Sequence, residues 1–179
     1  LVFGRKDLFV DRFLSKLKDA GIFYAGFGAS VKRCPQGAFT ICTRFHTMDQ
    51  ILHKMMKESD NLYAESMYYQ IAASTGNRPA STKSARNVER QLIRKIGLDP
   101  ARYKLADGSG LSLYNYLSAE LEVKLLRYAY RDENMYQQLK QSLPIAGVDG
   151  TLKKRMKTGY AHGNVKAKTG TLTGIISLA

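Results

Sequence analysis

Apolar side chains recur every three or four residues over much of this chain, which is the spacing of amphipathic helices. The first such stretch covers residues 7–20, and Gly21 follows it as a helix stop. A second helix is predicted to begin after Thr47, because Thr47 and Gln50 have the spacing of a capping box. The same criteria predict helices at residues 48–58, 62–73, 88–96, 119–125 and 134–141. The middle of the chain is therefore predicted to be a block of helices.

Short strands are predicted on either side of this block. β-Branched and aromatic residues on both sides of a Pro35–Gly37 turn predict strands at residues 22–31 and 38–45. Near the other end, residues 165–168 alternate between apolar side chains and lysine, and residues 175–179 are again strand-like. Strands from both ends of the sequence around a helical block predict an α+β fold, with an antiparallel sheet and helices packed against it.

The length and composition are sufficient for one domain. Hydrophobic residues make up 44% of the 179 residues, enough for one sizeable core, and no apolar run approaches the length of a transmembrane segment. The chain opens without Met or a signal-peptide pattern and closes inside a predicted strand. We therefore expect residues 1–179 to be a single domain that is cut at both ends.

The charge is strongly basic, with 28 Lys and Arg against 15 Asp and Glu, and favours polyanionic surroundings. No zinc-finger spacing or RNA-binding aromatic signature accompanies it, so no nucleic-acid partner is predicted. The three histidines have no metal-site spacing, and neither a metal nor another cofactor is predicted. Cys34 and Cys42 lie on either side of the predicted turn, and a disulfide or two free thiols fit equally well.

Two short motifs have residues suited to chemistry. Ser59-Asp60-Asn61 lies between two predicted helices and offers a hydroxyl and a carboxamide, which can relay a proton and bind a peptide amide. Taken alone, it is also an ordinary capping turn. In Lys168-Thr169-Gly170-Thr171, Gly170 removes a side chain where something must approach the strand closely.

Together these motifs are two of the three signature elements of penicillin-recognising serine enzymes. Four longer blocks follow one another in the chain: Met56–Glu65, Asp107–Ser112, Leu143–Leu152 and Lys166–Thr171. In sequence and order they resemble the D-alanyl-D-alanine carboxypeptidase/endopeptidase family, the class C low-molecular-mass penicillin-binding proteins, over nearly all of the chain. The resemblance implies a β-lactamase/transpeptidase-like domain, of which this chain would be the C-terminal portion.

The third signature element, Ser-x-x-Lys with the acylated serine, has no convincing match. Ser15 and Lys18 fit the spacing, but they share the predicted solvent face of the first helix with Asp11. Ser81 and Lys83 are only two residues apart, and on a helix their side chains would point in different directions. The resemblance therefore implies that the nucleophile belongs to a missing N-terminal part of the same protein.

The resemblance also implies roles for the residues that are present. Ser59 would help to pass a proton to the leaving amine, Asn61 would hold the substrate near its amide, and Lys168 would add positive potential. These are the three expected catalytic residues.

A second group would bind the substrate, again by resemblance. The hydroxyls of Thr169 and Thr171 would bind its terminal carboxylate, and Gly170 between them belongs to the same binding strand. The Thr171 N–H would donate one oxyanion-hole hydrogen bond. Asp107 and Ser109 are instead expected to shape their loop.

The activity implied is that of a serine-type D-Ala-D-Ala carboxypeptidase or endopeptidase, a hydrolase of peptidoglycan metabolism that works through an acyl-enzyme. The expected partners are peptidoglycan peptides and β-lactams, the expected location is the periplasm or outside the bacterial cell, and this chain alone is expected to be inactive. The alternatives are a β-lactamase-like hydrolase, which would share both motifs, and a non-catalytic cell-wall-binding module.

Overall fold

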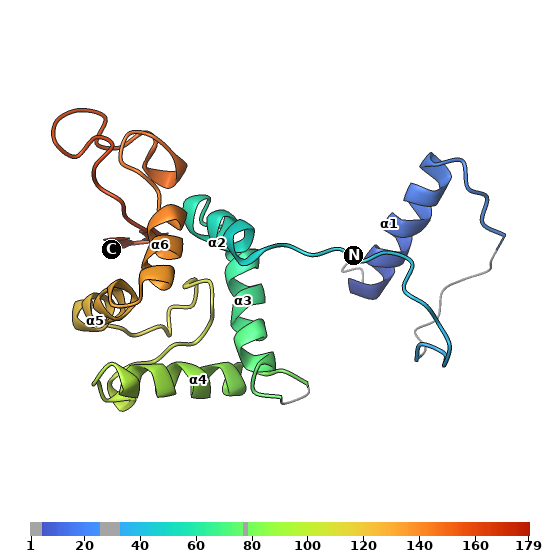
Figure 1. Cartoon of the computed structure of the whole chain (residues 1–179), viewed down its shortest axis with the longest axis horizontal. Helices are drawn as coiled ribbons and strands as arrows, with labels where there is room; N and C mark the ends of the chain where they lie inside the picture. Colours follow the sequence, from blue (N-terminus) through green and yellow to red (C-terminus); the bar gives the residue numbers. More distant parts are fainter. Residues whose placement is uncertain (1–4, 26–32, 77–78) are drawn as a thin grey trace. The chain divides into compact units, whose positions relative to one another are not determined.

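Residues 5–25, 33–76 and 79–179 are described by the computed structural model, and they contain six α-helices and one two-stranded sheet. The chain divides into two compact units, Leu1–Arg44 and Phe45–Ala179. The elements, labelled in Figure 1 where space allows, are α1 (Arg5–Asp19), α2 (Met48–Lys57), α3 (Asn61–Ala73), α4 (Thr82–Lys95), α5 (Ala119–Tyr130), α6 (Glu133–Ser142), β1 (Thr169–Leu172) and β2 (Ile175–Leu178), with single 3₁₀ turns η1 (Pro100–Arg102) and η2 (Gly150–Leu152).

The first unit contains α1 and the turn that the sequence predicted. The helix ends just before Gly21, whose φ of +71° suits a residue without a side chain. Ser15 and Lys18 are both exposed on α1, as expected for solubilising positions. The turn is present as well, closed by a hydrogen bond of 3.3 Å from Ala38 N–H to the Pro35 carbonyl.

The strands predicted in this unit are wrong where the structure describes them. Residues 22–25 and 38–45 form no strand, and residues 26–31 lie outside the described part. Phe39, Ile41 and Phe45 are 80 to 91% exposed, so these side chains have no packed surface of the kind that favours a strand. Cys34 and Cys42 are exposed and carry free thiols.

In the second unit five helices, α2 to α6, accompany the sheet. Two apolar clusters hold the helical part together: Tyr68, Ala72 and Ala85 between α3 and α4, and Ile93, Leu98, Tyr103 and Leu121 between α4, η1 and α5. Helix α6 packs against both α2 and α5. The predicted capping box at the start of α2 is present, and Ser81 and Ser118 cap α4 and α5.

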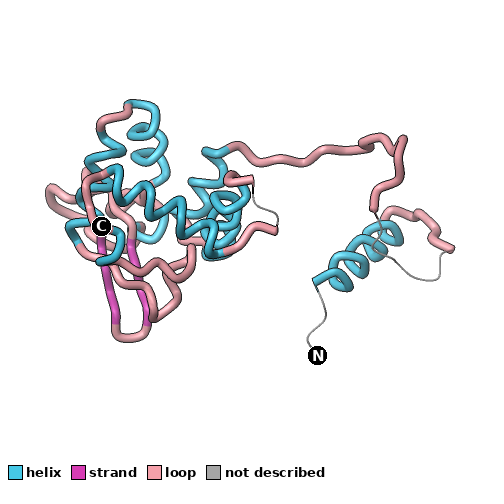
Figure 2. The backbone as a smooth tube through the Cα atoms, turned by 90° about the horizontal axis from the view of Figure 1, so that it is seen from below, coloured by secondary structure: helices cyan, strands magenta, loops and turns pink. Residues whose placement is uncertain are grey.

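The sheet is an antiparallel hairpin of β1 and β2, drawn in magenta in Figure 2. It begins at Thr169, so the strand predicted from residue 165 starts later than expected. Residues 165–167 run beside residues 144–146, with hydrogen bonds from Ala146 N–H to Val165 (2.9 Å) and from Ala167 N–H to Pro144 (3.1 Å). Helices beside an antiparallel sheet confirm the α+β class, whereas both strands come from the C-terminal end and none from the N-terminal end in the described residues.

Candidate active site

Ser59 lies in the short connection between α2 and α3, as the sequence predicted. Asp60 caps α3, because its carboxylate accepts hydrogen bonds from the N–H groups of Leu62 (2.9 Å) and Tyr63 (3.2 Å). Ser59 has a φ of +56°, a left-handed conformation that is uncommon for a residue with a side chain. Such local strain is typical of functional sites, so Asp60 has the structural role and Ser59 is the unusual residue of the motif.

Lys168 meets Ser59 across 109 residues of sequence. Its ammonium group donates a hydrogen bond of 2.7 Å to Ser59 Oγ and one of 2.6 Å to the Thr169 carbonyl. Burial lowers the pKa of Lys168 below that of a free lysine. The arrangement places a partly desolvated cation against a hydroxyl, which suits proton transfer and the stabilisation of negative charge.

The β1 strand presents its two threonines on the same side. Thr169 is half-buried and Thr171 exposed, and side-chain alternation places both on one face of the strand and Gly170 on the other. A Cβ on Gly170 would lie 2.3 Å from Ser177 Oγ of β2. The group that approaches Gly170 closely is thus the paired strand. Asn61 is exposed at the first position of α3.

A partly buried ion pair connects the segment before Ser59 to the segment before β1. Lys57, 8% exposed at the end of α2, contacts the carboxylate of Asp149, whose other oxygen accepts a hydrogen bond of 2.8 Å from Ile145 N–H. Burial would raise the pKa of Asp149, but the hydrogen bonds from Lys57 and Ile145 outweigh it and the pKa is lowered. Asp149 therefore holds two distant segments in a fixed register.

Asp107 shapes the loop in which it lies, as the sequence predicted. The Asp107 carboxylate accepts hydrogen bonds from the N–H groups of Gly110 (2.8 Å) and Ser112 (2.7 Å). Glu65 of α3 accepts from the N–H groups of Gly108 (3.2 Å) and Ser109 (3.0 Å). Both carboxylates are used to fix the backbone.

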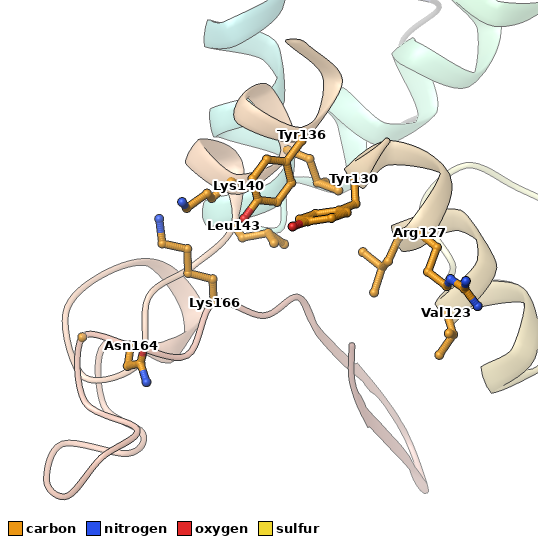
Figure 3. A pocket seen from close by; sticks show the side chains of 11 residues that line it. Val123, Arg127, Tyr130, Tyr136, Lys140, Leu143, Asn164 and Lys166 are labelled. Carbon is orange, nitrogen blue, oxygen red and sulfur yellow. The ribbon is translucent and has the colours of Figure 1, made fainter. Parts of the chain in front are cut away.

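A separate hollow of about 610 Å³ lies between α5, α6 and residues 163–166 (Figure 3). Its wall is mainly apolar and includes an edge-to-face pair, Tyr130 and Tyr136, with Arg127, Lys140 and Lys166 among the residues that line it. None of the predicted site residues lines it, although it is larger than the pocket lined by Glu89, Ile93 and Tyr103. The candidate site is therefore assigned by the Ser59–Lys168 geometry and not by cavity size.

Within residues 5–25, 33–76 and 79–179, no group of three or more His, Cys, Asp or Glu side chains could hold a metal ion. No helix in these ranges has the length and apolarity needed to cross a membrane.

Comparison with known proteins identifies the family. A family model described as the D-Ala-D-Ala carboxypeptidase 3 (S13) family matches residues 2–179. The chain belongs to this family. The predicted resemblance is thereby confirmed.

Relatives in the S13 family extend well beyond the region that is matched here. The D-alanyl-D-alanine carboxypeptidase DacB of Haemophilus influenzae is 33% identical over 92% of this chain but only 34% of its own length. The D-alanyl-D-alanine carboxypeptidase of Actinomadura sp. strain R39 is 37% identical over 74% of this chain and 25% of its own length. The chain thus spans about a third or less of these relatives.

A solved S13 structure confirms the fold. The crystal structure of penicillin-binding protein 4 (dacB) from Haemophilus influenzae, complexed with a β-lactam, superposes with a TM-score of 0.78 and 31% identity. The match covers 94% of this chain and 39% of that one. The chain therefore has the fold of the corresponding part of that protein.

Three residues near the S13 motifs were missed by the sequence reasoning. Lys57 and Asp149 form the partly buried ion pair, and the Thr151 hydroxyl lies 2.8 Å from that of Thr169. All three fall inside blocks that carried the resemblance, Met56–Glu65 and Leu143–Leu152. Their place inside these blocks could have indicated that the three residues matter, but the sequence does not show which residues they contact.

Proposed function

We propose that this chain is the C-terminal part of the penicillin-binding domain of a serine-type D-Ala-D-Ala carboxypeptidase or endopeptidase. The observation that carries the proposal is the 2.7 Å hydrogen bond from Lys168 Nζ to Ser59 Oγ, which joins the two motifs into one half-site. The half-site lies wholly in the unit Phe45–Ala179. The substrates are peptidoglycan peptides that end in D-Ala-D-Ala.

The nucleophilic serine comes from the N-terminal part of the same protein. Its oxygen attacks the carbonyl carbon of the D-Ala-D-Ala peptide bond, the C–N bond breaks, and the terminal D-Ala leaves as an amine that has gained the proton of the serine. Water then hydrolyses the ester. Ser59 passes the proton to the leaving amine, and the Lys168 ammonium group beside it keeps the hydroxyl oriented and favours its loss of the proton.

Substrate binding uses the other residues of the two motifs. Asn61, exposed at the start of α3, holds the substrate near its amide, and the hydroxyls of Thr169 and Thr171 bind its terminal carboxylate. The Thr171 N–H is one oxyanion-hole donor, and Gly170 lets β1 lie close to Ser177 of β2. β-Lactams, which carry a carboxylate and a reactive amide, acylate the same serine. The β-lactam complex of the Haemophilus influenzae relative supports β-lactam binding.

The setting that fits this activity is the bacterial cell envelope, in the periplasm or outside the cell. The cell wall that contains these peptides is anionic and complements a chain with a net charge of +13. The reaction needs no cofactor, because the nucleophile, proton relay and oxyanion donors are all protein groups.

Labelling with a fluorescent penicillin tests the proposal. The full-length protein should take up the label at a serine outside residues 1–179, and a D-Ala-D-Ala peptide should compete with it. The 179-residue chain should take up none, because it lacks the nucleophile. A full-length protein that stays unlabelled, or an adduct on Ser15 or Ser81, would contradict the proposal.

A further inference from the structure

Thr151 lies outside both signature motifs, and its side chain contacts strand β1. Its hydroxyl accepts a hydrogen bond of 2.8 Å from Thr169 Oγ1, across 18 residues of sequence. Thr151 is exposed, whereas Thr169 is half-buried. The Thr151 side chain therefore contacts the Thr169 hydroxyl, which in the proposed function binds the terminal carboxylate of the substrate.

The backbone around Thr151 is held on both sides. Leu152, which follows it, is completely buried, and Asp149, two residues before it, is fixed by Lys57 and by Ile145 N–H. Gly150 has a φ of +53°, and a Cβ there would lie 2.6 Å from the Lys57 carbonyl at the end of α2. Residues 149–152 are thus packed against the helix that leads into Ser59, and the backbone from which the Thr151 side chain extends is held in place.

The chemistry of two adjacent hydroxyls gives this contact a function. Each hydroxyl has one hydrogen to donate and can accept from another donor. A carboxylate only accepts, so Thr169 must point its hydrogen at the substrate. Once Thr169 turns its hydrogen from Thr151 to the carboxylate, the hydrogen bond between the two hydroxyls reverses, and Thr151 donates to Thr169 Oγ1. This orients the Thr169 hydrogen and strengthens its bond to the charged group.

We infer that Thr151 is a positioning residue for carboxylate recognition, acting through Thr169. This inference rests on the proposed function, in which Thr169 binds the terminal carboxylate. Thr151 itself does not touch the reacting atoms. Its effect should therefore be confined to ligands that carry the carboxylate.

The experiment compares Thr151→Val with wild type in the full-length protein, using benzylpenicillin and its methyl ester. The substitution keeps the shape of the side chain and removes the hydroxyl. The second-order rate constant of acylation by the free acid should fall about two- to tenfold, the usual effect of one lost hydrogen bond, while that of the ester stays the same. With a D-Ala-D-Ala peptide, KM should rise by a similar factor and kcat should change little.

Two further variants make the result decisive. Thr151→Ser retains the hydroxyl and should restore the preference for the free acid. Thr158→Val, an exposed threonine seven residues along the same segment, is the matched control and should behave as wild type.

Three outcomes would overturn the inference. An equal loss for acid and ester would mean that the substitution only disturbs the structure, and an unchanged rate for both would mean that Thr151 does not assist Thr169. A wild-type protein that no penicillin acylates would refute the proposed function itself and this inference with it, and that result is distinct because it appears before any substitution.

Discussion

The hydrogen bond between Lys168 and Ser59 should be measurable as a coupling free energy in acylation. The perturbation is a double-mutant cycle in the full-length protein: Ser59→Ala, Lys168→Met and the two combined. Methionine keeps an unbranched side chain of similar length and removes the charge. If the two residues act as one unit, the second substitution should add little to the effect of the first.

The size of the coupling follows from the geometry. The contact is 2.7 Å long, partly buried, and made by a charged donor. Hydrogen bonds to charged groups contribute about 1.5–3 kcal/mol, so the coupling should correspond to roughly 10- to 150-fold in the acylation rate constant. Burial lowers the pKa of Lys168, and deprotonation of its ammonium group should therefore reduce the rate at a pH below the 10.5 of a free lysine.

The assay is the second-order rate constant for labelling by a fluorescent penicillin, with the thermal unfolding midpoint as a check on folding. Lys166→Met is the control, because Lys166 is another half-buried lysine two residues away and lines the separate hollow of Figure 3. It should change the rate little. Rate effects of Ser59→Ala and Lys168→Met that simply multiply, with a coupling below about 0.5 kcal/mol, would refute the idea that the two residues work together.

Three more predictions concern stability. Burial raises the pKa of Glu89 from 4.5 to about 7, although a hydrogen bond from Tyr68 and the charge of Arg86 oppose the shift. The stabilisation of the folded state by protonated Glu89 is therefore present below pH 4.5 and lost as the pH rises through about 7. Glu89→Gln should raise the unfolding midpoint at pH 8 and not at pH 4. The pKa of Asp149 is instead lowered from 3.8, so the stabilisation of the folded state by its carboxylate is present above that pH and lost as the pH falls. In a series of unfolding midpoints measured at different pH, Asp149→Asn should therefore show a weaker loss of stability in acid. Gly108→Ala should destabilise the protein by about 1–3 kcal/mol in urea unfolding, because its Cβ would lie 2.6 Å from Tyr68 Cβ, whereas Ser109→Ala should cost less.

The sequence predicted the helices well because their signals are local. The capping box at Thr47 and the glycine after α1 are each decided by a few neighbouring residues, and the structure contains both. The strands at residues 22–31 and 38–45 were predicted from β-branched and aromatic content alone. Such residues favour a strand only when a pleated surface packs against them, and Ile41 is 91% exposed.

The site was predictable in part, for a related reason. Motif resemblance indicated Ser59 and Lys168, and the structure brings them together. It did not indicate that Lys57 pairs with Asp149, 92 residues away, because partner choice over that distance depends on how α2 and residues 144–149 pack. Read as a sequence, Asp149-Gly150-Thr151 is an ordinary turn.

The contacts that hold the half-site together are independent of the nucleophile. Asp149 ties Lys57 to Ile145, Ile145 is bridged to Lys166, and the chain continues from Lys166 through Lys168 into β1. The walls bearing Ser59 and Thr169 are therefore set by one connected series of contacts within Phe45–Ala179. Under the proposed function, a catalytic serine from elsewhere in the protein would meet donors that are already oriented, which is the condition under which electrostatic stabilisation of a transition state costs no reorganisation.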